Sequence, residues 1–163
     1  MTQVAPVTPA GTEPAARFAA LLVQAGMEAR TAGDAQSVLW GKLIVNAAIN
    51  PVSALWDVPN GTVMTRPELR QVAAAAAREA ESVARAKGIA LLFPDAAAEV
   101  ADVSMRTRDN ISSMLQDIRG GKRTEIDAIN GAVLREGAAL GMALPVNEML
   151  VRRVRELEAQ QSP

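Results

Sequence analysis

Residues 41–51 have the sequence GKLIVNAAINP, in which apolar side chains cover most of the circumference of a helix. Three polar residues interrupt it at a spacing of four: Lys42, Asn46 and Asn50. Four residues turn an α-helix through roughly 400°, so the three side chains form one stripe on a helix that is otherwise apolar. An unpaired amide in a protein interior costs on the order of 1–3 kcal/mol, so a helix buried in a core must direct this stripe at a polar space, either a ligand cavity or a compensating network of polar groups.

The stripe has two interpretations from its spacing alone. It either faces a ligand cavity or forms the solvated side of an amphipathic helix. Solvated faces elsewhere in the chain use charged residues, as in RRVRELE at residues 152–158, whereas asparagine is a poor helix former. The spacing leaves both interpretations open.

Composition limits the chemistry of the chain. The 163 residues suffice for one domain with a core, and they include no cysteine, histidine or tyrosine. Disulfides and thiolate sites are therefore excluded, no metal site is expected, and proton transfer falls to lysine, aspartate or glutamate. The net charge of −1 gives no footprint for nucleic acid or an anionic membrane. No uncharged apolar run approaches the ~20 residues of a membrane span, no signal peptide is recognised, and a cytoplasmic protein is expected.

Hydrophobic periodicity predicts an all-α fold. Residues 1–13 are expected to form an irregular lead-in with one short strand, and residues 27–30 a second strand. The helical domain is expected over residues 14–163. Its helices are predicted over residues 14–26, 35–50, 67–87, 95–106, 109–119, 124–140 and 146–158. A single continuous helix over 95–119 is the alternative for the fourth and fifth of these.

Cap and turn residues predict several helix boundaries. Asp34 is expected to cap the helix that carries the polar stripe, and Pro51 to end it. The segment VPNGTV, residues 58–63, is expected to be a loop. Thr124 with Asp127 three residues later resembles a capping box, which predicts a helix start there.

Four further polar residues have ordinary structural explanations when each is taken alone. Asn60 belongs to an Asn-Gly pair, which is typical of a tight turn. Asn110 and Ser113 lie three apart at an expected helix start, where both residue types serve as caps. Glu125 suits the first turn of a helix, where the macrodipole favours a carboxylate.

Taken together, two blocks of sequence resemble the C-terminal domain of ketopantoate reductase (2-dehydropantoate 2-reductase). The blocks are WGKLIVNAAINPVSALWDVPNG at residues 40–61 and NISSMLQDIRGGKRTEIDAINGAVL at residues 110–134, within a resemblance that covers residues 14–158. The ordered motifs are Lys-x₃-Asn-x₃-Asn-Pro, Asn-Gly, SSMLQD and TEID. The resemblance implies the helical fold of the ketopantoate reductase and 6-phosphogluconate dehydrogenase C-terminal type. It also implies NADPH-dependent reduction of 2-dehydropantoate to (R)-pantoate, on the route to coenzyme A.

The resemblance also implies a role for each motif residue. Lys42 becomes the proton donor, since an ammonium stabilises the charge that develops on a ketone oxygen and supplies its proton. Glu125 becomes a second catalytic residue, which contacts the cofactor and holds Lys42 charged and oriented. The substrate-binding residues become Asn46, Asn50, Asn60, Asn110, Ser113 and Met114.

The family enzyme has a second half, a Rossmann domain with a glycine-rich turn, and no G-x-G-x-x-G occurs in this sequence. We therefore expect NADPH to be held by a Rossmann domain in cis or in trans, with MTQVAPV as a remnant of its last strands. The isolated chain is expected to be inactive. Two alternatives stay open: a non-catalytic dimerisation or partner-binding module, and a reductase half for another 2-oxo acid. The alanine-rich helix at residues 67–87 could pack on its own core or on a second copy in a homodimer.

Overall fold

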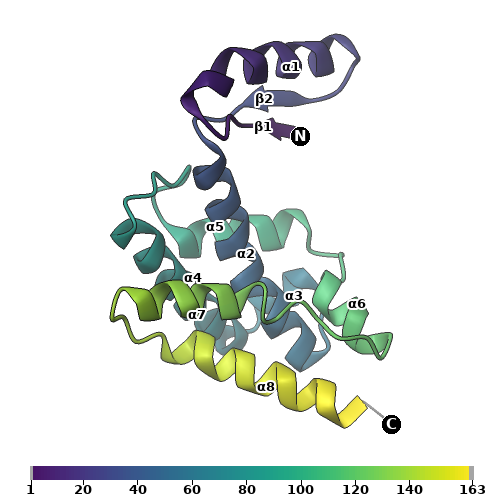
Figure 1. Cartoon of the computed structure of the whole chain (residues 1–163). Helices are drawn as coiled ribbons and strands as arrows, with labels where there is room; N and C mark the ends of the chain where they lie inside the picture. Colours follow the sequence, from purple (N-terminus) through teal and green to yellow (C-terminus); the bar gives the residue numbers. More distant parts are fainter. Residues whose placement is uncertain (1, 162–163) are drawn as a thin grey trace.

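A computed structural model describes residues 2–161, and it begins with a small βαβ unit (Figure 1). Strands β1 (Thr2–Val4) and β2 (Ala29–Thr31) are parallel and pair directly, residue for residue. Parallel strands need a long crossover, which here consists of a 3₁₀ turn, η1 (Pro9–Gly11), and helix α1 (Thr12–Gln24). The short strands expected in the lead-in and near residues 27–30 are both present.

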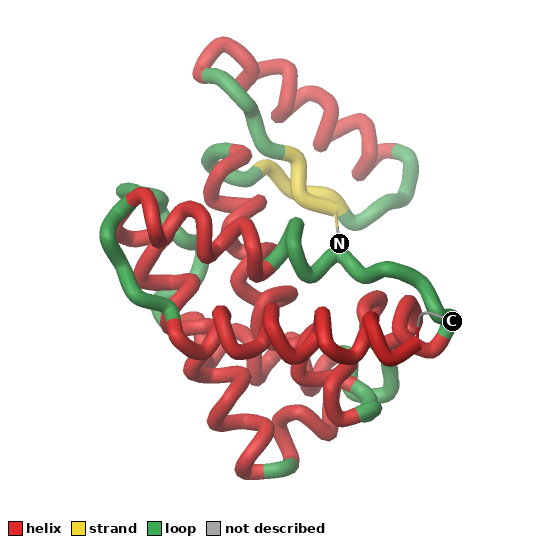
Figure 2. Tube along the Cα trace, turned by 60° about the horizontal axis from the view of Figure 1, so that its bottom comes forward, coloured by secondary structure: helices red, strands yellow, loops and turns green. Residues whose placement is uncertain are grey.

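Helix α1 packs on the two strands through the buried side chains Ala15 and Ala19. Its other face is open, with Phe18 55% exposed and Leu21 60% exposed. Figures 1 and 2 show the unit at one end of the molecule, joined to the helices through the start of α2. Helix α1 contacts β1, before residue 13, and β2, after it. The domain division expected at residue 13 stays a prediction.

Helix α2 (Ala35–Trp56) runs through the centre of the helical part and contacts α3, α4, α5, α6 and α8. Its side chains Ile44, Ala47 and Val52 are fully buried. By length and composition alone α2 could cross a membrane, but 56% of its most apolar window is buried inside the protein. The apolar composition of α2 is thus accounted for by its central position in the helical core.

The remaining helices surround α2 and complete the predicted helical fold (Figures 1 and 2). In α4, the alanines Ala73, Ala76, Ala77 and Ala80 are fully buried in the protein's own core. Small side chains on that face let α4 approach α2 closely. The bounds are α3 (Asn60–Thr65), α4 (Pro67–Ala86), α5 (Ala96–Arg106), α6 (Ser113–Arg119), α7 (Asn130–Ala139) and α8 (Pro145–Gln161).

The helix end expected at Pro51 is wrong, because α2 continues through the proline to Trp56. A proline inside a helix lacks an N–H and crowds the carbonyl of the residue four positions earlier, here Ala47. That carbonyl finds a donor outside the helix: Asn130 Nδ2 lies 2.9 Å from Ala47 O. The helix ends instead at Asp57, which has left-handed backbone geometry with φ of 50°.

Two other expected features of this region are also wrong. The VPNGTV segment contains the start of α3, because Asn60 and Gly61 donate backbone hydrogen bonds to the chain after α5 and the segment turns into a helix. The helix expected from residue 109 begins at Ser113, since the Ser112 hydroxyl caps it by accepting from Leu115 N at 3.1 Å.

The capping box expected at Thr124 does not form. Thr124 N donates to Glu158 Oε1 at 2.6 Å, and its hydroxyl accepts from Ile126 N at 3.2 Å. Helix α7 starts only at Asn130. Thr124 therefore ties the loop before α7 to α8 rather than starting a helix.

Candidate functional site

A cleft of about 630 Å³ lies between the first half of α2, helix α5 and the strand pair. Two of the predicted site residues, Lys42 and Asn46, line the cleft from α2. Glu99 lines it from α5, and Arg30 from β2. The complete lining is Gln3, Arg30, Ser37, Val38, Gly41, Lys42, Val45, Asn46, Leu92, Phe93, Glu99 and Val103.

The start of α2 fixes this wall of the cleft. The Asp34 carboxylate caps the helix by accepting from Ser37 N at 2.8 Å, and it accepts from the Ser37 hydroxyl at 2.6 Å. The hydroxyl bond first, and then the backbone bond, hold the pKa of Asp34 below its ordinary value. From this cap, helical spacing puts Val38, Lys42 and Asn46 on the same face.

The polar groups of the cleft suit a small organic anion. Lys42 is exposed, and it forms no ion pair with any of residues 2–161. Arg30 is likewise exposed and unpaired within that range. An ammonium and a guanidinium can bind a carboxylate and a carbonyl oxygen, while Val45 and Phe93 supply apolar wall. Glu99 adds a negative charge, which lies 3.7 Å from Arg106.

Asn50 continues the stripe of Lys42 and Asn46 but does not line the cleft. Its side chain is 7% exposed, directly before Pro51 in the sequence. Within the described part of the chain, no group donates to or accepts from its amide. Asn50 is therefore buried outside the lining of the cleft.

Asn60 and Asn110 form a second group. Asn60 N donates to Asn110 O at 3.0 Å, and Asn60 Nδ2 donates to Thr107 Oγ1 at 3.0 Å. Asn60 Oδ1 is buried and has no partner among the described residues. Asn110 lines a different hollow, together with Gln116 and Arg119.

The last three predicted residues lie on α6 and in the loop after it. Ser113 is exposed in the first turn of α6, whereas Met114 is 1% exposed and packs in the core. Glu125 is exposed in the loop before α7 and forms no ion pair with Lys42. The structure thus brings Lys42 and Asn46 together but does not bring Glu125 into their cleft, and the roles of these residues stay predictions.

Sequence reasoning did not identify Arg30 or Glu99 as site residues. Arg30 lies in a strand of three residues, and Glu99 lies in the first turn of a helix, where a carboxylate is ordinary. Neither position carries a local signal of function. Their place in the cleft depends on how β2 and α5 pack around α2.

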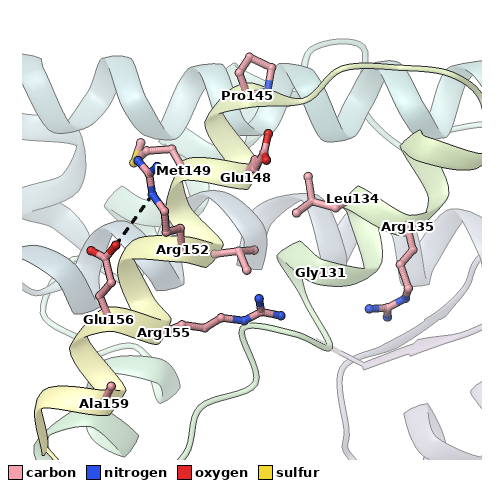
Figure 3. Close-up of a pocket in the computed structure, with 11 residues that line it drawn as sticks. Gly131, Leu134, Arg135, Pro145, Glu148, Met149, Arg152, Arg155, Glu156 and Ala159 are labelled. Carbon is pink, nitrogen blue, oxygen red and sulfur yellow. Dashed lines mark ion pairs between the residues drawn. The ribbon is translucent and has the colours of Figure 1, made fainter.

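A larger hollow, of about 890 Å³, lies on the outer side of α7 and α8 (Figure 3). Figure 3 shows Leu134 and Met149, which line the hollow together with several charged side chains of the two helices. Two of its arginines are already paired, since Arg152 lies 3.9 Å from Glu156 and Arg155 lies 2.6 Å from Asp127. None of the predicted site residues lines this hollow. We therefore place the candidate site in the α2 cleft.

The carboxylates of residues 2–161 form no cluster of three or more that could hold a metal ion. The polar side chains of the candidate cleft are one carboxylate, two cations, two amides and a hydroxyl, a set suited to an organic anion and not to a metal cation.

The comparisons with known proteins agree on one family. The family model for the ketopantoate reductase PanE/ApbA C terminal matches residues 34–158. The 2-dehydropantoate 2-reductase of Archaeoglobus fulgidus is 43% identical over 141 residues, which cover 86% of this chain and 47% of the relative. That of Pyrobaculum aerophilum is 39% identical over 142 residues, 87% of this chain and 50% of the relative. The chain thus spans about half the length of the curated relatives it matches.

Solved structures agree with this assignment. The PanE/ApbA family ketopantoate reductase from Ralstonia eutropha JMP134 superposes with a TM-score of 0.78 at 36% identity, over 90% of this chain and 49% of that one. A D-mandelate dehydrogenase with NADH and anilino(oxo)acetate superposes with a TM-score of 0.85 at 25% identity, over 95% of this chain and 65% of that one. The family model covers well over half of the sequence, and the chain therefore belongs to the ketopantoate reductase family, of which it carries the helical C-terminal domain.

Proposed function

We propose that this chain is the substrate-binding and proton-donating half of an NADPH-dependent 2-dehydropantoate 2-reductase. The observation that carries the proposal is the position of Lys42 and Asn46 side by side on one wall of the α2 cleft. The amine is exposed and has no ion-pair partner among residues 2–161, so it is available to a ligand.

Lys42 would act on the oxygen of the 2-oxo group. The nicotinamide, when bound, supplies a hydride to the carbonyl carbon, and negative charge then develops on the oxygen. The Lys42 ammonium stabilises that charge and donates a proton to the oxygen, which completes the hydroxyl group. Asn46 donates a hydrogen bond to the same end of the substrate, and Arg30 binds its carboxylate.

The other roles rest on the resemblance of the motifs. We propose further substrate contacts from Asn50 of α2, from the second group (Asn60 and Asn110), and from Ser113 and Met114 of α6. We propose a contact with the cofactor from Glu125, in the loop before α7.

The described residues fit the substrate end of the reaction better than the cofactor. A dinucleotide pyrophosphate is held by a strand, a glycine-rich turn and a helix N-terminus, and these 163 residues contain no G-x-G-x-x-G. A Rossmann domain, in cis or in trans, would hold the cofactor. The strand pair β1–β2 could continue the sheet of that domain, because its outer edges carry no further strand within residues 2–161.

A second candidate is a reductase half for a different 2-oxo acid. The similarity to D-mandelate dehydrogenase with NADH and anilino(oxo)acetate supports it, because that protein combines the same helical fold with an aromatic oxo acid. A hydrophobic side of a pocket discriminates only weakly, by about 1–3 kcal/mol per methylene, so one fold can serve several such acids. A non-catalytic helical module is the remaining alternative.

The test joins this chain to the nucleotide-binding half of the Archaeoglobus fulgidus relative and measures NADPH and NADH oxidation. The substrates are 2-dehydropantoate and a panel of aliphatic and aromatic 2-oxo acids. A preference for 2-dehydropantoate supports the proposal, and a preference for an aromatic acid supports the second candidate. A folded fusion that binds NADPH but reduces none of the acids would show that the chain is a non-catalytic module.

A further inference from the structure

The interior of α2 lacks one hydrogen bond that a regular helix has. In a helix the N–H of residue 51 donates to the carbonyl of residue 47, but residue 51 is a proline. Pro51 has no N–H, and its ring also crowds the Ala47 carbonyl. Ala47 is fully buried and Pro51 is buried, so the replacement donor is expected to come from the protein and not from water.

The side chain of Asn130 supplies that donor from another helix. Asn130 is the first residue of α7 and is completely buried. Its Nδ2 donates to Ala47 O at 2.9 Å and to Asn147 Oδ1 at 3.0 Å, so both of its N–H groups are used. Since both partners are acceptors, the amide nitrogen and not the oxygen must face them.

A second layer of hydrogen bonds holds Asn130 in this position. Asn147 Nδ2 donates to Ala76 O at 3.2 Å and to Glu79 Oε2 at 2.7 Å. The Glu79 carboxylate also accepts from Val146 N and Asn147 N, each at 2.9 Å. The network therefore connects the α2 carbonyl at the proline to α4, α7 and α8.

We propose that Asn130 is a positioning residue, which replaces the hydrogen bond that Pro51 removes and so sets the direction of the half of α2 that carries Lys42 and Asn46. Ala47 directly follows Asn46, so the new bond acts within one residue of the cleft wall. Sharp bends in helices occur mostly at a proline or where a side chain inserts into the hydrogen-bond ladder, so the direction of α2 is sensitive at this point. The inference rests on the proposed function only in taking the cleft as the substrate site. The pairing of Asn130 with Pro51 is independent of any reaction.

The pairing is tested by a double-mutant cycle of Asn130→Ala, Pro51→Ala and the double variant, with unfolding followed in urea. In the Pro51→Ala background the new N–H of residue 51 can donate to Ala47 O, so the Asn130 donor becomes dispensable. The cavity left by Asn130→Ala is the same in both backgrounds and cancels. We expect the loss in the folding equilibrium constant caused by Asn130→Ala to be about fivefold smaller with Ala at position 51 than with Pro51. That factor corresponds to the net contribution of one hydrogen bond. An equal loss in both backgrounds would overturn the inference.

Val133→Ala is the matched control, because Val133 is fully buried on α7 and its side chain makes no hydrogen bond. Its effect should be the same with Pro51 and with Ala at that position. If Asn130→Ala fails to fold alone, a folded double variant is the expected rescue, and two unfolded variants contradict the pairing.

Positioning itself is measured by NMR of the same variants. We expect the Asn46 side-chain amide and the backbone amides of residues 42–46 to shift in Asn130→Ala, to return toward their original positions in the double variant, and to stay in place in Val133→Ala. Unshifted resonances in a folded Asn130→Ala would contradict the positioning role. Neither measurement uses substrate or cofactor, so failure here is distinct from failure of the reductase proposal.

Discussion

Lys42 of α2 and Glu99 of α5 line the same cleft from two different helices. The acidic residue of this cleft is thus Glu99, whereas Glu125 lies outside it. Glu99 is not a proton donor to the substrate in the proposed reaction, but its charge acts on any anion that enters.

Removal of that charge is predicted to strengthen the binding of an anionic substrate. For Glu99→Gln in the fused enzyme we expect KM for the 2-oxo acid to fall about fivefold, which corresponds to about 1 kcal/mol of relieved repulsion. The effect should shrink as salt is added. Asp102→Asn is the matched control, because Asp102 lies on the same helix and pairs with Arg106 at 2.9 Å but does not line the cleft. A KM change of equal size in the two variants would contradict this role of Glu99.

Asn46→Ala is predicted to affect the reaction without affecting stability. The Asn46 side chain is half-buried in the cleft and bonds to no described residue, so its loss should leave the free energy of unfolding within about 0.5 kcal/mol. Loss of its hydrogen bond to substrate should lower kcat/KM about tenfold. Urea unfolding and steady-state kinetics check the two parts. A strongly destabilised Asn46→Ala would show that the residue is structural instead.

Two glycine-to-alanine changes are predicted to have opposite signs. A Cβ on Gly61 would lie 2.6 Å from Arg108 Cβ and 3.0 Å from Arg108 Cα, so Gly61→Ala must displace backbone and should cost about 1–3 kcal/mol. A Cβ on Gly41 would meet Phe93 at an ordinary 3.5 Å, and alanine is the better helix former. We expect Gly41→Ala to stabilise the protein by about 0.5–1 kcal/mol. Thermal unfolding of both variants checks the signs, and a neutral Gly61→Ala would contradict the close approach of α3 to the chain after α5.

The stability of the protein is predicted to depend on pH through Asp127. A hydrogen bond from Arg155, with its charge, and a weaker bond from Arg123 hold the pKa of Asp127 below its ordinary value. A lowered pKa in the folded state means that the stabilisation is present above the unfolded value near 3.8 and is lost as pH falls through the folded value. The pair is partly exposed, so after screening by water it contributes at most about 1 kcal/mol.

For Asp127→Asn we therefore expect a lower unfolding temperature than wild type at neutral pH and a difference that disappears in acid. Asp109→Asn is the control, since Asp109 forms an exposed pair with Arg108 at 3.4 Å and its side chain is 88% exposed. A difference between Asp127→Asn and wild type that persists unchanged below the folded pKa would contradict the ion-pair explanation.

Much of the fold is predictable because its signals are local. The Asp34 cap of α2, the start of α4 at Pro67 and the alanine repeat of α4 each follow from neighbouring residues. The boundaries that sequence did not predict depend on distant partners. Helix α2 continues through Pro51, and the open Ala47 carbonyl accepts from Asn130 of α7, a distant partner that no local pattern near residue 51 could indicate.

The residues of the candidate site also fall into two sets, those that local sequence predicts and those that depend on the packing of distant elements. Lys42 and Asn46 were identifiable because residues four apart in a helix lie on the same face. Arg30 and Glu99 were not, because they reach the cleft through the packing of β2 and α5 around α2. Glu125 was expected beside Lys42; it lies in an exposed loop outside the cleft lining, and its role stays a prediction.

The most direct test of the central claim is kcat/KM for the fused enzyme with Lys42 and with Lys42→Ala. A general acid contributes about 10²–10⁴-fold to a rate, so we predict a loss of that size in the variant. Lys87→Ala is the control, because Lys87 pairs with Glu136 away from the cleft and should leave the rate unchanged. An enzyme that retains its full rate after Lys42→Ala would contradict the assignment of Lys42 as the proton donor.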